Sequence, residues 1–97
     1  MKFHRYQGHL IVAICDEEII GKTFKQGNIV LDVTTSFYQG EKVDIDKVIE
    51  VVKEADIVVI TGRRIVNKLA EKGLIDKNYA LEVEGQLHIQ IVKEVLE

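Results

Sequence analysis

The sequence predicts a single α/β (or α+β) domain with a mixed β-sheet, an N-terminal hairpin and two main helices. Short β-branched runs such as Ile57–Ile60 indicate strands that are covered on both faces. Two segments, beginning near Asp44 and Thr61, repeat apolar residues at helical spacing. The 97 residues are 46% apolar and contain no linker or repeat, so we expect one domain over residues 1–97.

The chain begins with a predicted β-hairpin. Lys2–Tyr6 and His9–Cys15 are rich in aromatic and β-branched residues, and Gln7-Gly8 separates them as a two-residue turn. The second arm is wholly apolar from Leu10 onward, which places it inside the sheet rather than at an edge.

The next segment predicts a short helical turn, one strand and a loop. Asp16–Gly21 suits a single helical turn, with Asp16 as its cap and Gly21 at its end. Asn28–Thr34 alternates apolar and polar residues and predicts a half-buried strand. Thr35–Gly40 is polar and predicts a loop.

Two helices carry recognisable end signals. Asp44 is a natural N-cap for the first, whose apolar stripe comprises Ile45, Val48, Ile49 and Val52. Thr61 is the expected cap of the second, and Gly73 is the expected left-handed residue at its end. The buried run Ile57–Ile60 between the helices is a strand.

The chain ends with a second predicted hairpin. Tyr79–Val83 and Leu87–Val92 form its arms around Glu84-Gly85, and Lys93–Glu97 is expected to continue as a short polar tail. In the second arm His88 lies on the polar face.

Composition excludes several classes of protein. No segment is apolar for long enough to cross a bilayer, and no leader precedes the first strand, so we expect no membrane partner. The single cysteine, Cys15, fits a reducing cytoplasm. His4 and His9 are too few to hold a structural metal, and the sequence predicts neither a metal nor a cofactor. The net charge of −3 gives no overall attraction to nucleic acid.

The predicted strand-to-helix turn Gly62-Arg63-Arg64 is the strongest candidate for anion binding. The first N–H groups of a helix lack partners, a glycine allows close approach to them, and arginine binds phosphate or carboxylate through two hydrogen bonds. The alternative is a plain turn with solvated arginines. Lys22 follows Gly21 in a Gly-Lys-Thr triplet, but Asp16 stands where a phosphate-binding loop needs glycine, which excludes that motif.

Cys15, Asp16 and His88 are weak candidates for catalysis. A cysteine at the start of a helical turn can have a lowered pKa, whereas the neighbouring Glu17 and Glu18 disfavour the thiolate. A Cys15–His88 pair requires their strands to be neighbours. The alternative is a small buried cysteine and a hydrogen-bonded histidine.

Phe37 and Tyr38 are candidates for a recognition surface, because exposed aromatic residues in loops can stack on bases. The alternative, which we favour, is that this loop folds its own aromatic rings back onto the core, as compact loops do.

The landmarks of the chain resemble a family of small archaeal proteins of unknown function and about this length. The matching residues are Cys15-Asp16-Glu17-Glu18, Gly21-Lys22-Thr23-Phe24, Ser36-Phe37-Tyr38 with Gly40, Gly62 with Arg64, Gly73-Leu74-Ile75-Asp76, and His88. The resemblance implies no established reaction, but implies an association with translation factors. One departure is Leu87, where the family pattern has proline or a small residue, which weakens a turn-based role for His88.

These features support two main hypotheses. The first is a binding module for RNA or a translation-associated protein, whose contact residues are Gly62, Arg63, Arg64, Lys22, Phe37 and Tyr38. The alternative is a small enzyme that uses Cys15, Asp16 and His88. A third hypothesis is a structural homo-oligomer that pairs through apolar strand edges.

Overall fold

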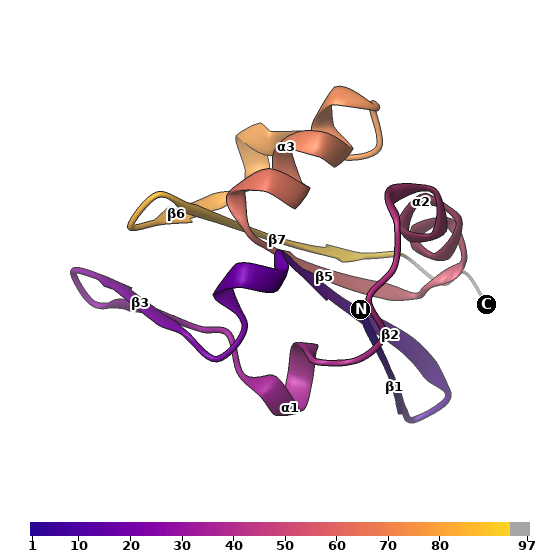
Figure 1. Cartoon of the computed structure of the whole chain (residues 1–97). Helices are drawn as coiled ribbons and strands as arrows, with labels where there is room; N and C mark the ends of the chain where they lie inside the picture. The colour runs from indigo at the N-terminus through magenta and orange to yellow at the C-terminus, as the bar shows by residue number, and fades with distance from the viewer. Residues whose placement is uncertain (94–97) are drawn as a thin grey trace.

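A mixed five-stranded sheet in the order β1-β2-β5-β7-β6 forms the centre of the molecule (Figure 1). The computed structural model describes residues 1–93. The sheet consists of β1 (Lys2–Tyr6), β2 (His9–Cys15), β5 (Ile57–Thr61), β6 (Leu81–Val83) and β7 (Gln86–Val92). A separate hairpin consists of β3 (Thr23–Gln26) and β4 (Ile29–Asp32). The α-helices are α1 (Thr35–Tyr38), α2 (Ile45–Glu54) and α3 (Arg63–Glu71), and the 3-10 turns are η1 (Glu17–Ile19) and η2 (Lys77–Tyr79).

The sheet is mixed because one of its four pairings is parallel. β2 runs parallel to β5, while β1–β2, β5–β7 and β6–β7 are antiparallel. The register places Cys15 opposite Thr61 and Thr61 opposite His88. These three residues therefore form one row across the sheet and face the same side.

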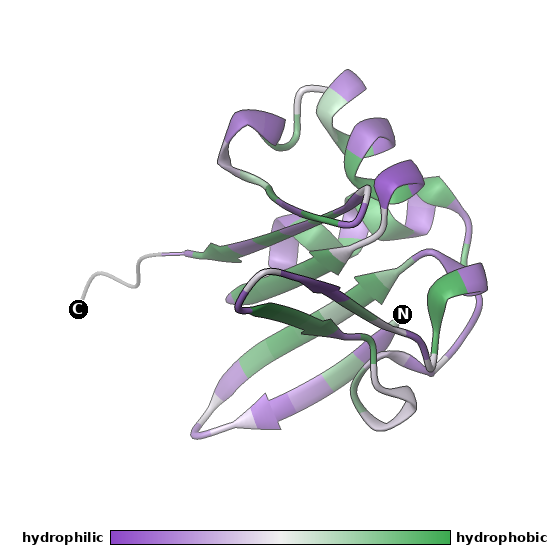
Figure 2. Ribbon diagram, turned by 90° about the vertical axis from the view of Figure 1, so that its left-hand side faces the viewer, coloured by the Kyte–Doolittle hydropathy of each residue, from purple (hydrophilic) through white to green (hydrophobic). Residues whose placement is uncertain are grey.

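Helices α2 and α3 cover one face of the sheet, and the β3–β4 hairpin, η1 and α1 lie on the other face (Figure 1). Alternate residues of the central strands supply the two cores: Val12, Val58 and Ile60 face the helices, whereas Ala13 and Val59 face the opposite layer. In Figure 2 the apolar residues gather between these layers, and hydrophilic residues occupy the outer sides of the helices and the turns.

Several expectations from the sequence are confirmed. The hairpin turns have positive φ at Gln7, Gly8, Glu84 and Gly85. The Asp44 carboxylate accepts a hydrogen bond of 2.9 Å from the Lys47 N–H and caps α2. Gly73 has φ +74°, and the Leu74 N–H returns to the Leu69 carbonyl, so α3 ends in a left-handed glycine turn as predicted.

Other expectations are wrong. Thr35–Gly40 is not an open loop, because α1 forms there with the Thr34 hydroxyl accepting a hydrogen bond from the Phe37 N–H. The sequence analysis also missed β3, in which Phe24 is the single apolar residue, and η2, which contains Tyr79. Most of the expected Lys93–Glu97 tail lies outside the described residues. Within residues 1–93, the structure contains no helix that is long and apolar enough to cross a membrane.

Candidate functional site

The candidate site lies at the carboxyl ends of the two parallel strands. After β2 the chain turns to η1 on one face of the sheet, and after β5 it enters α3 on the opposite face. Such a divergence opens space at the edge of a sheet and is a common place for ligands. The predicted residues Cys15, Asp16, Gly62, Arg63 and Arg64 all lie at or just after the ends of these two strands.

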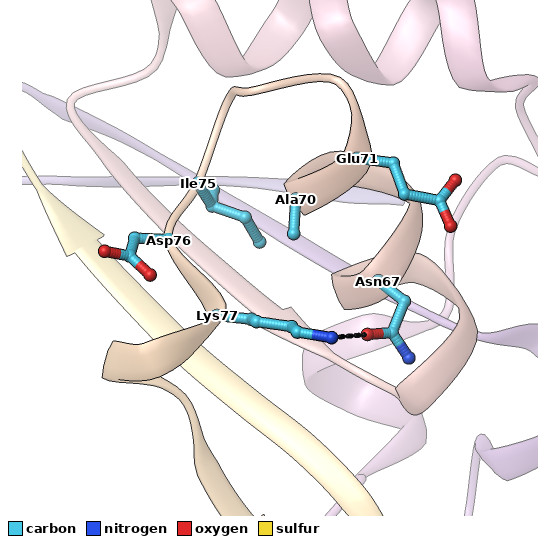
Figure 3. Close-up of a pocket in the computed structure, with 6 residues that line it drawn as sticks. All are labelled: Asn67, Ala70, Glu71, Ile75, Asp76 and Lys77. Carbon is cyan, nitrogen blue, oxygen red and sulfur yellow. Dashed lines mark hydrogen bonds between the residues drawn. The ribbon is translucent and has the colours of Figure 1, made fainter.

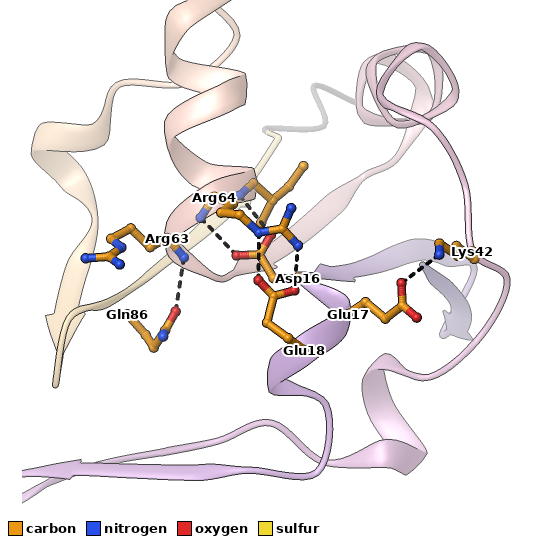
Figure 4. Close-up of polar contacts among 8 residues, drawn as sticks. Asp16, Glu17, Glu18, Lys42, Arg63, Arg64 and Gln86 are labelled. Atoms are coloured by element: carbon orange, nitrogen blue, oxygen red, sulfur yellow. Dashed lines mark hydrogen bonds and ion pairs between the residues drawn. The ribbon is translucent and has the colours of Figure 1, made fainter.

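Asp16 caps α3 from a distant part of the chain. Asp16 is a buried residue, 8% exposed, and its carboxylate accepts hydrogen bonds from the Arg64 N–H at 2.9 Å and the Ile65 N–H at 3.0 Å (Figure 4). Two expectations are thereby corrected. Asp16 does not cap η1, and Thr61 does not cap α3 but is fully buried at the end of β5. The N-terminus of α3 therefore binds the carboxylate of Asp16, a residue of the same chain, in place of an external anion.

Gly62 is required by this arrangement for two reasons. Its φ of +129° is rarely adopted by residues with a side chain, and a Cβ atom at this position would overlap the carboxylate of Asp16. The glycine therefore makes room for Asp16 rather than for an external ligand.

The side chain of Arg64 is also engaged internally. Its Nε and Nη2 atoms donate to the two carboxylate oxygens of Glu18 at 2.6 and 2.5 Å (Figure 4). These hydrogen bonds lower the pKa of Glu18, whereas burial raises the pKa of Asp16 despite the hydrogen bonds from the helix. We call Asp16, Glu18 and Arg64 the Asp16 cluster. Its charges and hydrogen-bonding groups pair mainly with one another.

Arg63 points the other way. Its backbone N–H donates to the Gln86 side chain at 3.1 Å, and its guanidinium extends away from the Asp16 cluster (Figure 4). It borders a hollow of about 390 Å³. The hollow is lined by Arg63, Asn67, Lys77, Asn78, Ala80, Glu82, Gly85 and Leu87. We call this the Arg63 hollow.

A second hollow has a volume of about 380 Å³ and shares lining residues with the first. Figure 3 shows the side chains that line the second hollow. Asn67 and Lys77 line both, and the Lys77 ammonium lies 3.5 Å from the amide oxygen of Asn67. In the second hollow Lys77 lies among two acidic residues, Glu71 and Asp76, whereas the Arg63 hollow has Arg63 and Lys77 against Glu82.

A row of polar side chains crosses the opposite face of the sheet. The Thr61 hydroxyl lies 2.8 Å from the Tyr38 hydroxyl and 2.7 Å from Nδ1 of His88. Burial lowers the pKa of His88 and, as the largest effect, raises the pKa of Tyr38. Strand β5 separates β2 from β7, so Cys15 and His88 are not on neighbouring strands. The strand order therefore excludes the simple pairing that a Cys15–His88 catalytic dyad requires.

Cys15 lines a separate cavity of about 470 Å³. Burial raises the pKa of its thiol to about 11, which disfavours the thiolate at neutral pH. The cavity extends between the end of β2, the segment 39–43, α2 and the start of α3. We call it the Cys15 cavity.

The remaining predicted contact residues do not join the Arg63 hollow. Tyr38 is 4% exposed, and Phe37 stacks on the ring of His4 with centroids 4.7 Å apart. Both rings pack inward, in agreement with the alternative weighed for this segment. Lys22 is exposed, and its charge lies near Glu18. Within residues 1–93, no three His, Cys, Asp or Glu side chains are grouped to hold a metal ion.

Sequence reasoning missed Asn67, Lys77, Asn78 and Gln86. Asn67 is the only polar, uncharged residue of α3, a weak signal that was available. The other three lie in connecting segments or at a strand start, and only the tertiary structure brings them to α3.

Comparisons with known proteins agree with this fold and assign no activity. A family model described as a protein of unknown function (DUF424) matches residues 4–93. The crystal structure of an uncharacterized conserved protein from Methanopyrus kandleri is similar, with a TM-score of 0.72 and 23% sequence identity over 99% of this chain and 93% of that one. At this identity the likeness shows the fold alone. A search of curated proteins found no match.

Proposed function

Because the chain belongs to the DUF424 family of unknown function, we propose from its geometry that it is a small binding module that holds phosphate groups of RNA. The proposed contact site is the Arg63 hollow, and the setting is a translation-associated process. Non-enzymatic binding is the function that the arrangement of charges supports best.

The state of Arg63 is the observation that carries this proposal. Among residues 1–93, the ion pairs are Lys42–Glu17 and Arg64–Glu18, so the guanidinium of Arg63 has no carboxylate partner there. A free arginine at the rim of a hollow can donate two hydrogen bonds to one phosphate.

The lining of the hollow supports the same ligand. Arg63 and Lys77 supply two cations against the single carboxylate of Glu82, and the side-chain amides of Asn67 and Asn78 supply additional donors. Lysine, arginine and asparagine are the side chains that commonly contact phosphate in nucleic-acid complexes. The acidic chain as a whole, with a net charge of −3, makes such contacts local and strongly dependent on salt.

The test is a fluorescence-anisotropy titration of labelled single-stranded RNA over a series of salt concentrations. If Arg63 and Lys77 each neutralise one phosphate, the slope of log affinity against log salt is about −1.4. Arg63→Ala is expected to weaken binding by about fivefold and to reduce the slope by about 0.7.

Arg64→Ala is the matched control, because it removes the adjacent arginine, which Glu18 already neutralises. Affinity for RNA is expected to change much less than in Arg63→Ala. Binding that is independent of salt, or that is unchanged in Arg63→Ala, contradicts the proposal, provided that thermal melting shows both variants folded.

The alternative of an enzyme based on Cys15, Asp16 and His88 receives less support. The thiol of Cys15 has a raised pKa, Asp16 is occupied as a helix cap, and β5 lies between the strands of Cys15 and His88.

A further inference from the structure

We propose that the Cys15 cavity binds a small zwitterion with an apolar tail, the chemistry of a free amino acid with a large apolar side chain. This site is separate from the Arg63 hollow, and the inference does not depend on RNA binding.

The position and size of the cavity suit a small molecule. It lies where the connections after β2 and β5 diverge to opposite faces of the sheet. Its volume of about 470 Å³ is within the range of about 300–1,000 Å³ that is typical of ligand pockets. Cys15 at the end of β2, Asp16 just after it and Ile65 from α3 all line the cavity.

Part of the cavity wall is aliphatic, although Asp16, Gln39 and Glu41 also line the cavity. Ile14 and Val48 are core residues that reach its wall, and Ile20, Val43 and Ile65 add partly buried aliphatic surface. An aliphatic or aromatic tail placed here leaves water and contacts hydrocarbon, which is the main favourable term for binding.

The mouth of the cavity carries charges of both signs. Lys42 and Glu17 form an ion pair of 2.9 Å with side chains that are 83% and 66% exposed (Figure 4). Arg64 also lines the cavity, but its guanidinium is already bound by Glu18. Exposed ion pairs contribute little to stability, so a ligand can replace the Lys42–Glu17 pairing at small cost.

A ligand that replaces the Lys42–Glu17 pair is expected to carry both a negative and a positive group. A ligand carboxylate can pair with Lys42, and a ligand ammonium can pair with Glu17. A simple anion or a simple cation replaces the Lys42–Glu17 pair with one new ion pair, whereas a zwitterion forms two, each of them exposed and worth about fivefold in affinity (about 1 kcal/mol) or less. A zwitterion pairs with both residues, and its tail then lies against the aliphatic part of the wall formed by Ile14, Val48 and Ile65.

Isothermal titration calorimetry of the full chain with leucine tests this inference. We expect saturable binding with a dissociation constant of about 1 mM or lower. Isopentylamine and 4-methylpentanoate, which lack the carboxylate and the ammonium respectively, are expected to bind about fivefold more weakly. Alanine, which lacks the tail, is expected to bind more weakly by a similar factor.

Variants locate the binding. Lys42→Ala and Glu17→Gln are both surface changes and are expected to weaken leucine binding about fivefold. Lys47→Ala, an exposed lysine of α2 that does not line the cavity, is the matched control and is expected to bind like the unmodified chain.

Three results overturn the inference. They are no heat of binding with leucine, equal affinity for leucine and either of its singly charged analogues, and equal affinity of Lys42→Ala and Lys47→Ala. Alkylation of Cys15 provides a second readout, because bound leucine is expected to slow the reaction of this cavity-lining thiol. Unchanged alkylation at saturating leucine also contradicts the inference.

Discussion

Two neighbouring arginines at the start of α3 differ in what they can do. The Arg64 guanidinium is held by both carboxylate oxygens of Glu18, whereas the Arg63 guanidinium borders an open hollow. Successive helical residues point about 100° apart, so adjacent side chains reach different surroundings. The positive charge of Arg64 is therefore neutralised within the Asp16 cluster, whereas the positive charge of Arg63 remains available to a ligand.

Gly62→Ala is expected to have the largest effect on stability, because it directly disrupts the Asp16 cluster. The new side chain imposes an unfavourable φ and overlaps Asp16, so the free energy of unfolding is expected to fall by about 3 kcal/mol or more. Urea denaturation measures this loss. Gly73→Ala, at the other end of α3, has a positive φ but open space around its Cβ and is expected to lose only about 1 kcal/mol. Equal losses of unfolding free energy in the two variants contradict a destabilising overlap between the new side chain and Asp16.

Asp16→Ala tests whether the cap that Asp16 provides for α3 is stronger than the local cap that Asp44 provides for α2. It leaves two helix N–H groups without their acceptor and is expected to reduce the free energy of unfolding by about 2 kcal/mol. Asp44→Ala removes an exposed cap with one hydrogen bond and is expected to reduce it by about 1 kcal/mol. Urea denaturation compares the two. A larger loss in Asp44→Ala contradicts this view of the Asp16 cluster.

Glu18→Gln is expected to make Arg64 available for phosphate binding, as Arg63 already is. Loss of the Glu18 charge releases Arg64, so affinity for single-stranded RNA is expected to rise by about threefold in the anisotropy titration. Arg64→Ala is expected to abolish this gain when combined with Glu18→Gln. A gain that persists in the double variant shows that it comes from the reduced negative charge alone.

The pH dependence of stability separates the two carboxyl groups of the Asp16 cluster. The pKa of Asp16 is raised by burial, so its contribution is largest below the unfolded value of about 3.9 and falls as pH rises through the folded pKa. The pKa of Glu18 is lowered by Arg64, so its contribution is present above about 4.3 and is lost as pH falls.

Urea denaturation between acidic and neutral pH measures this difference. Relative to the unmodified chain, Asp16→Asn is expected to gain stability as pH rises, whereas Glu18→Gln is expected to lose it. Parallel profiles for the two variants contradict the opposite pKa shifts. This is the smallest of the expected effects, since Glu18 is exposed and solvent weakens its interaction.

Much of the fold was predictable because its signals are local. The turns Gln7-Gly8 and Glu84-Gly85, the cap at Asp44 and the stop at Gly73 each depend on residues within a few positions. The β3 strand escaped detection because its burial is slight, with Phe24 as its only apolar residue.

The position of the candidate site could be predicted from the sequence, but the hydrogen-bond and charge partners of its residues could not. A buried strand followed by Gly62-Arg63-Arg64 located the strand-to-helix turn correctly. The sequence does not show that Asp16, 48 residues before Arg64, accepts the hydrogen bonds of the helix. It also does not show that Lys77 and Asn78 come to the side of α3 that Arg63 faces.

The sequence by itself determined the α/β class, the two hairpin turns, the two main helices and the cationic turn between β5 and α3. Only the tertiary structure decided the strand order, the separation of Cys15 from His88, and which arginine is free. The physical reason is range: caps, turns and periodicity act over a few residues, whereas the partner of a charge is selected by which distant segments the packed sheet brings to the same edge.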